Sequence, residues 1–129
     1  MSGDLLDTSI LVAPDSASFS ELPATAAISV ITLGELQAGV LLARDERTLA
    51  ARRTRLGAVR AAFSPLPVDE AVAERYGEIL ARSRSQRRRA KARDLLIIAT
   101  AAAHARTLHT HDERQAALAR AAGISVHAI

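Results

Sequence analysis

Apolar residues recur along this chain in two alternating patterns. Short apolar runs predict β-strands, and these runs lie at residues 3–7, 27–31, 65–68, 107–110 and 124–129. Longer stretches with apolar residues three or four positions apart predict α-helices, which occupy about ten residues after Thr32, then 45–63, a stretch capped by Asp69, 94–105 and 112–122. The stretch from Pro14 to Pro23 is consistent with either a short helix or a loop.

Strands that alternate with helices predict right-handed β-α-β crossovers and a sheet covered by helices on both faces. We therefore expect an α/β fold, a three-layer α/β/α sandwich with a mostly parallel central sheet. The chain has 129 residues, no internal repeat and no linker-like tract, so a single domain over residues 1–129 is expected. Sheets of this kind carry their functional sites at the carboxyl ends of the strands.

Composition narrows the classes of function. The chain has no cysteine, which excludes a disulfide framework and a thiolate metal site. Aromatic residues make up only 2%, so RNA or DNA binding by aromatic stacking has little support. The first residues lack the basic region of a signal peptide, and the longest uncharged stretch, residues 22–34, is shorter than the ~20 residues of a membrane-spanning helix. We expect a cytoplasmic protein with no membrane partner.

The charge of the chain points to a polyanionic partner. Arginine and lysine together number 17 against 14 acidic residues, the pI is near 10.5, and Lys91 is the only lysine. Guanidinium groups make bidentate contacts with phosphate, so phosphate-bearing partners are favoured, although a merely solvated basic surface has the same composition.

Four acidic residues stand out by their positions at the predicted ends of strands or in the first turns of helices. Asp7 interrupts the apolar run LLDTSILV, and an unpaired buried carboxylate is costly. Glu35 lies in the first turn after the second predicted strand, Asp94 opens an apolar helix, and Asp112 follows the strand that ends at Thr110. We expect Asp7, Glu35 and Asp112 to meet at the carboxyl edge of a parallel sheet, where Asp94 joins them only if its helix is suitably placed.

Each acid also has a structural interpretation. The sequence TLGE from Thr32 to Glu35 matches a capping box, Asp94 and Asp112 could cap helices, and Asp7 could accept hydrogen bonds from its own turn. Several carboxylates at one edge repel one another unless a cation offsets their charge, and Mg²⁺ or Mn²⁺ is the cation that suits oxygen ligands. Ser9 and Thr110 each stand two residues from an acid and could hydrogen-bond a carboxylate or a metal-bound water.

Four segments of the sequence resemble PIN-domain proteins, in particular the VapC-type ribonuclease toxins of bacterial type II toxin–antitoxin pairs. The similarity spans nearly the whole chain. It rests on the segments LLDTSILV at 5–12, SVITLGELQAGV at 29–40, RDLLIIATA at 93–101 and LHTHD at 108–112.

The resemblance implies an acidic quartet with defined roles. The quartet falls on Asp7, Glu35, Asp94 and Asp112; Asp7, Asp94 and Asp112 would bind Mg²⁺ or Mn²⁺, Glu35 would complete the site or orient the attacking water, and Ser9 and Thr110 would be the supporting hydroxyls. Asp4 is left out because no Thr-Ser pair follows it. The family also implies RNA cleavage, homodimerisation, inhibition by a cognate VapB-type antitoxin in a hetero-oligomer, and operator DNA binding only through that complex.

A basic run from Arg82 to Arg93 ends beside the third acid of the quartet. Its functional interpretation is that five side chains hold RNA phosphates near the metal, namely Arg87, Arg88, Arg89, Lys91 and Arg93. Its structural interpretation is a solvated charged surface. His109 and His111 form an H-x-H pair, which we expect to be ordinary surface or supporting histidines and not a transition-metal site.

Two alternatives to a ribonuclease remain. One is a catalytically inactive PIN-like module that binds nucleic acid or protein through its arginines. The other is a receiver-like phosphoacceptor, which also gathers acids at a parallel sheet edge. The receiver alternative is the weaker one, because Lys91 does not stand at the end of a late strand.

Overall fold

The computed structural model describes residues 3–12, 22 and 24–129. Within these residues the chain forms five strands and six helices. In chain order they are β1 (Asp4–Leu6), α1 (Thr8–Val12), β2 (Ala26–Ser29), α2 (Val30–Leu41), α3 (Glu46–Ala62), β3 (Pro65–Leu66), α4 (Glu70–Ser85), α5 (Ala92–Ala103), β4 (Thr107–Thr110), α6 (Glu113–Ala121) and β5 (Val126–Ala128).

The five strands form one sheet in the order β3-β2-β1-β4-β5. Every strand pairing among the described residues is parallel, so the expected α/β architecture is confirmed. β1 is the central strand, and its Leu5 is aligned with Ala27 of β2 on one side and Leu108 of β4 on the other. This order places the carboxyl ends of β1, β2 and β4 next to one another.

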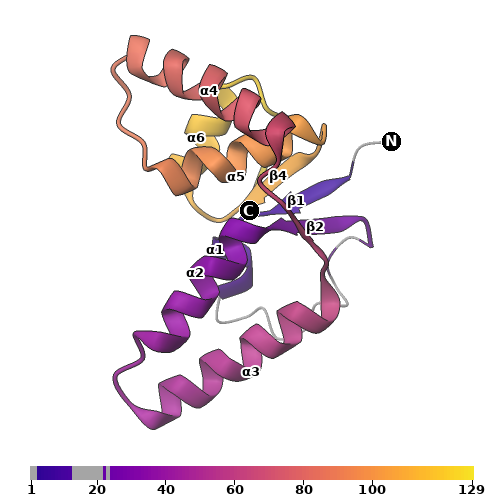
Figure 1. Cartoon of the computed structure of the whole chain (residues 1–129), viewed down its shortest axis with the longest axis vertical. Helices are drawn as coiled ribbons and strands as arrows, with labels where there is room; N and C mark the ends of the chain where they lie inside the picture. The colour runs from indigo at the N-terminus through magenta and orange to yellow at the C-terminus, as the bar shows by residue number, and fades with distance from the viewer. Residues whose placement is uncertain (1–2, 13–21, 23) are drawn as a thin grey trace.

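Helices cover the two faces of the sheet, as Figure 1 shows: α4, α5 and α6 lie together on one side and α1, α2 and α3 on the other. Successive strand residues point to opposite faces, so Leu5 and Leu6 enter different cores and are both fully buried. Leu5 packs with Ile98 of α5, whereas Leu6 packs with Leu36 of α2. The result is the expected three-layer sandwich.

Side-chain caps fix where several helices begin. Asp45 and Asp69 are the N-caps of α3 and α4, and the carboxylate of Asp69 accepts a 3.0 Å hydrogen bond from the N–H of Val72, as the sequence predicted. α2 begins earlier than predicted because the Ser29 hydroxyl caps it, accepting from the N–H of Ile31 at 3.0 Å. The predicted strand 27–31 therefore ends two residues too late.

That early start also makes the capping-box interpretation of Glu35 wrong. Glu35 lies in the interior of α2, beyond the first turn, where it cannot cap the helix. The cap interpretation of Asp94 is wrong as well, since α5 begins at Ala92 after Lys91 and Asp94 lies inside its first turn. The cap interpretation of Asp112 is confirmed: it is the N-cap of α6.

The remaining boundaries differ from the sequence-based ones by a few residues. The basic run is not all loop, because α4 continues to Ser85 and only the residues that follow connect it to α5. The helix-or-loop alternative between Pro14 and Pro23 lies outside the described residues, apart from Leu22 and its position in the apolar cluster around Leu6. No helix in the described part of the chain is both long enough and apolar enough to cross a membrane.

Candidate active site

The four acids predicted from the sequence line one hollow of about 240 Å³ at the carboxyl edge of the sheet. We call this hollow the acidic cavity, and its acids are Asp7, Glu35, Asp94 and Asp112. They come from four places in the fold: the end of β1, helix α2, helix α5 and the end of β4. The structure thus brings together side chains that are as far apart in sequence as Asp7 and Asp112.

Asp7 is the most buried member, with 6% of its surface exposed. One carboxylate oxygen, Oδ2, accepts hydrogen bonds from the Ser9 hydroxyl at 2.7 Å and from the Thr110 hydroxyl at 2.8 Å. The main-chain N–H of Asp7 donates to the carbonyl oxygen of His109 at 2.8 Å. These donors satisfy the polar group that interrupts the first apolar run, and they hold its carboxylate in one orientation.

The two hydroxyls beside Asp7 also order the end of β4. The Ser9 hydroxyl accepts from the N–H of His111 at 2.9 Å, and the Thr110 hydroxyl accepts from the N–H of Asp112 at 2.9 Å. Both hydroxyls therefore donate to the Asp7 carboxylate and accept from a main-chain N–H group just after β4. This network fixes the turn that carries Asp112 relative to Asp7.

Asp112 combines a structural contact with a place in the acidic cavity. Its Oδ1 accepts hydrogen bonds from the main-chain N–H groups of Arg114 at 2.9 Å and Gln115 at 3.2 Å, which is its capping function. Oδ2 takes no part in those two bonds. The structural and functional interpretations of this residue are therefore compatible.

Glu35 is held from two sides. Its Oε1 accepts a 2.7 Å hydrogen bond from the hydroxyl of Thr8, and its Oε2 lies 3.4 Å from Nε of Arg93. Sequence reasoning missed Thr8 as a functional neighbour. The sequence feature that could have identified Thr8 is its position between Asp7 and Ser9. Because α1 begins at Thr8, the side chains of Thr8 and Ser9 point in different directions.

The pKa of Asp94 reflects its crowded position. Burial raises the pKa of this carboxyl above its ordinary value of 3.8, and the positive charge of Arg93 opposes that rise. The carboxylates of Asp7 and Asp112 raise the Asp94 pKa further, because a second negative charge nearby disfavours ionisation. A bound cation would relieve this repulsion.

Basic side chains border the acids. Of the five basic residues that we expected to hold RNA phosphates, Lys91 and Arg93 line the acidic cavity, and so does Arg114, which sequence reasoning missed. The other three arginines of the proposed set, Arg87, Arg88 and Arg89, are exposed on the connection between α4 and α5 and do not line it. Phosphate approaching the acids would therefore meet two groups of positive charge, one inside the cavity and one outside.

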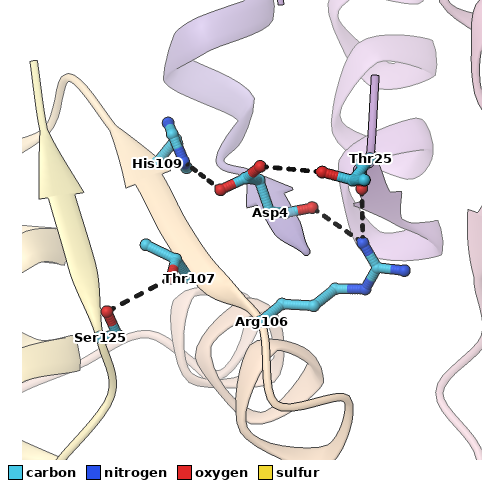
Figure 2. A network of polar contacts seen from close by, with 6 residues as sticks. All are labelled: Asp4, Thr25, Arg106, Thr107, His109 and Ser125. Carbon is cyan, nitrogen blue, oxygen red and sulfur yellow. Dashed lines mark hydrogen bonds and ion pairs between the residues drawn. The ribbon is translucent and has the colours of Figure 1, made fainter. Parts of the chain in front are cut away.

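The acid left out of the set, Asp4, belongs to a separate polar network at the other end of β1 (Figure 2). One of its carboxylate oxygens lies 2.6 Å from Nε2 of His109, and the other accepts from the Thr25 hydroxyl at 3.2 Å. Arg106 donates to the main-chain carbonyl oxygens of Asp4 and Thr25. His109 is thus engaged in a structural contact, and the His111 ring donates to the terminal Ile129 carbonyl at 3.2 Å.

The donor set of the acidic cavity fits a hard divalent cation in kind. All of its acids are oxygen donors, and the hydroxyls of Ser9 and Thr110 support one of them. Among residues 3–12, 22 and 24–129, no three acidic or histidine side chains already converge closely enough to hold one ion. Mg²⁺ usually keeps several waters and needs only one or two direct carboxylate ligands, so such convergence is not required.

The PIN-domain family model matches residues 5–121, and the chain therefore belongs to the PIN-domain family. Within the family, it is a VapC-type protein. It is 42% identical over 100 residues to ribonuclease VapC8 of Mycobacterium tuberculosis, an alignment that covers 75% of this chain and 88% of that protein.

Solved structures agree with this assignment. The fold is similar to that in the crystal structure of VapBC-5 from Mycobacterium tuberculosis, a member of the VapBC family of toxin–antitoxin systems, with a TM-score of 0.85, 32% identity and 100% coverage of both chains. It is also similar to VapBC2 from Rickettsia felis bound to a DNA fragment from its promoter, with a TM-score of 0.82, 25% identity and 97% coverage of both chains.

Proposed function

We propose that this chain is a metal-dependent endoribonuclease that acts as the toxin of a type II toxin–antitoxin pair. One observation carries the proposal: four carboxylates from four separate elements line a single cavity that Lys91, Arg93 and Arg114 also line. Clustered acids alone would repel phosphate, whereas clustered acids with a cation and basic neighbours attract it. The relative named ribonuclease VapC8 supports the same activity.

In this proposal Asp7, Asp94 and Asp112 hold Mg²⁺ or Mn²⁺. Bound there, the cation supplies Lewis-acid chemistry, which activates water and stabilises the charge that develops during phosphodiester cleavage. Asp7 has the most firmly fixed carboxylate of the three, because it is buried and accepts hydrogen bonds from two hydroxyl groups. Asp94 has a raised pKa without a cation, so a positive charge in the cavity would stabilise its ionised form.

Glu35 has a different environment and a different role. Its two oxygens contact Thr8 and Arg93, so the side chain is oriented across the acidic cavity before any substrate is present. We assign it to completing the cation site or orienting the attacking water. Arg93 can then pair with either of two anions, the Glu35 carboxylate or an RNA phosphate. Its guanidinium is exposed, so it can contact the phosphate when RNA is bound.

RNA is the polyanion that we assign to the basic surface. Lys91 and Arg93 would hold phosphates inside the acidic cavity, and Arg87, Arg88 and Arg89 would hold flanking phosphates on the connection between α4 and α5. Contacts of this kind position a nucleic acid without reading its sequence. Since the substrate is cellular RNA, we place the activity in the cytoplasm.

The partner in this proposal is a cognate VapB-type antitoxin that covers the acidic cavity. Support comes from the similar solved structures, which are toxin–antitoxin assemblies, one of them with promoter DNA. We extend this to a homodimer of the present chain, to a hetero-oligomer with the antitoxin, and to operator DNA binding through that complex.

The test is cleavage of total cellular RNA by the purified chain with Mg²⁺ or Mn²⁺ and, in parallel, with EDTA. Discrete fragments that require the metal are the expected result, and sequencing their ends identifies the cleavage site. RNA binding that persists in EDTA without cleavage at any metal concentration would contradict the proposal and favour a catalytically inactive binding module. The match to the PIN-domain family already disfavours the receiver alternative.

A further inference from the structure

Gln115, a residue that the proposed reaction does not use, connects two of the acids. It lies in the first turn of α6 with only 3% of its surface exposed, and it borders the acidic cavity. Its side-chain Nε2 donates a 3.0 Å hydrogen bond to the main-chain carbonyl oxygen of Asp94 on α5. Its main-chain N–H donates at 3.2 Å to Oδ1 of Asp112. One residue therefore contacts both Asp94 and Asp112.

Stability alone does not explain a glutamine at this position. Its side-chain oxygen, Oε1, is buried and has no hydrogen-bond partner among the described residues. A buried acceptor without a partner is unfavourable, and an apolar side chain of similar length would avoid it. The other buried residues of α6, Ala116 and Ala119, are apolar, as expected for a helix that packs on the sheet.

The contact with Asp94 has a consequence that an apolar residue cannot reproduce. Asp94 lies in the first turn of α5 and Asp112 caps α6, and their negative charges in one cavity push the two helix ends apart. The hydrogen bond from Gln115 joins the start of α6 directly to the first turn of α5 and opposes that separation. The spacing of the two carboxylates is therefore set before a cation arrives.

We propose that Gln115 is a positioning residue that fixes the distance between Asp94 and Asp112 and thereby sets the affinity of the acidic cavity for a divalent cation. This inference rests on the proposed function, in which those two carboxylates bind the ion. Groups that orient metal ligands typically change metal affinity by about 10- to 100-fold when they are substituted.

The test compares Mn²⁺ binding and thermal stability in wild-type protein, Gln115→Met and Gln115→Leu. Met and Leu have apolar side chains similar in size to that of Gln, and both lack the donor to the Asp94 carbonyl oxygen. Gln37→Met is the matched control, because Gln37 is exposed on α2 and does not line the acidic cavity. Free Mn²⁺ is measured by electron paramagnetic resonance, and the unfolding midpoint is measured without metal.

We expect the Gln115 variants to bind Mn²⁺ about tenfold or more weakly while their metal-free unfolding midpoints stay equal to the wild-type value or rise. Gln37→Met should match wild type in both measurements. Unchanged Mn²⁺ affinity would overturn the inference, and so would a loss of affinity that accompanies a lower midpoint in both variants, since that result indicates a purely structural role. Wild-type protein that does not bind Mn²⁺ would instead refute the cation site of the proposed function.

Discussion

Thr110 donates a 2.8 Å hydrogen bond from its hydroxyl to the carboxylate of Asp7, although 103 residues separate the two in the sequence. The same hydroxyl accepts from the main-chain N–H of Asp112 at 2.9 Å. Thr110 is completely buried, so water cannot replace either bond. A single hydroxyl thus joins the chain segments that carry two of the four acids.

Thr110→Val should therefore affect both stability and activity. Valine keeps the shape of the side chain but removes the partner of the Asp112 N–H and leaves Oδ2 of Asp7 with one hydroxyl donor, Ser9, instead of two, which costs about 1–3 kcal/mol of unfolding free energy. RNA cleavage should fall by about tenfold or more, because both acids lose orientation. Urea denaturation and initial cleavage rates measure the two effects.

Thr107→Val on the same strand is the control for this substitution. Among the residues that the structure describes, the Thr107 hydroxyl hydrogen-bonds to the exposed Ser125 hydroxyl at 3.3 Å, and Thr107 does not line the acidic cavity. A Thr110→Val protein that cleaves RNA at the wild-type rate would show that this hydroxyl has no part in orienting the acids.

Substitution of two helix-capping aspartates should have opposite effects, with one variant losing activity and the other losing stability. Asp112→Asn keeps a good capping side chain, so its unfolding free energy should change little, yet cleavage should fall by roughly 100-fold because the proposed cation ligand loses its charge. Asp69→Ala removes the cap of α4, at a cost of about 1 kcal/mol, and should leave the activity of the folded protein unchanged. An Asp112→Asn protein with full activity would restrict Asp112 to capping.

The raised pKa of Asp94 predicts a pH-dependent gain in stability when its charge is removed. The folded state disfavours ionised Asp94, so the metal-free protein loses stability as the pH rises from the ordinary value of 3.8 through the raised pKa of Asp94. Asp94→Asn should therefore raise the metal-free unfolding midpoint at pH 7. The difference in unfolding midpoint between Asp94→Asn and wild type should shrink below pH 3.8, where both side chains are neutral.

Mn²⁺ provides the second half of that test. It should raise the unfolding midpoint of wild type at pH 7 and should have a much smaller effect on Asp94→Asn, because a ligand stabilises only the state that binds it. If Asp94→Asn is less stable than wild type at pH 7 and responds equally to Mn²⁺, Asp94 is a structural residue.

The exposed arginines on the α4–α5 connection should contribute affinity for RNA without contributing to chemistry. Substituting Arg87, Arg88 and Arg89 with Gln should weaken RNA binding and reduce the slope of log affinity against log salt by about two, given ~0.7 counterions released per phosphate contact on a single strand. The maximal cleavage rate should stay close to the wild-type rate. Binding is measured by fluorescence anisotropy across a salt series.

A charge-matched control separates position from net charge. Arg44, Arg53 and Arg60 are exposed around or on α3, and none of them lines the acidic cavity. Substituting these three arginines with Gln removes the same total charge. It should change the slope of log affinity against log salt less than the substitutions on the α4–α5 connection do. Equal slopes for the two triple variants would mean that the run beside Asp94 makes no special contact with RNA.

Much of the fold could be predicted because hydrophobic periodicity and caps are local signals. The strand at 107–110 was located to the residue, and Asp69 and Asp112 were correctly expected to cap the helices that follow them. The start of α2 was misplaced because Ser29 lies within the otherwise apolar run AISVI at 27–31, which favours a strand. Only its φ and ψ angles and its hydrogen bond to Ile31 identify it as the cap.

The placement of Asp7, Glu35 and Asp112 at one edge followed from parallel topology, whereas the partners of the acids could not be predicted in this way. Thr8, Arg114 and Gln115 were missed because which side of a helix faces the acidic cavity depends on helix packing, a property that no local pattern encodes. From the sequence, the position of Asp94 depended on how its helix packs. It reaches the acidic cavity because α5 packs across the sheet with its first turn beside the start of α6.

The most direct test of the account compares two aspartates of the first strand region, Asp7→Asn and Asp4→Asn, in RNA cleavage with Mn²⁺. Asp7 lines the acidic cavity, whereas Asp4 contacts His109 at the other end of β1. Both proteins should show the circular dichroism of a folded chain. We expect Asp7→Asn to lose cleavage by at least about 100-fold and Asp4→Asn to retain it. Full cleavage by folded Asp7→Asn would contradict the assignment of the acidic cavity as the active site.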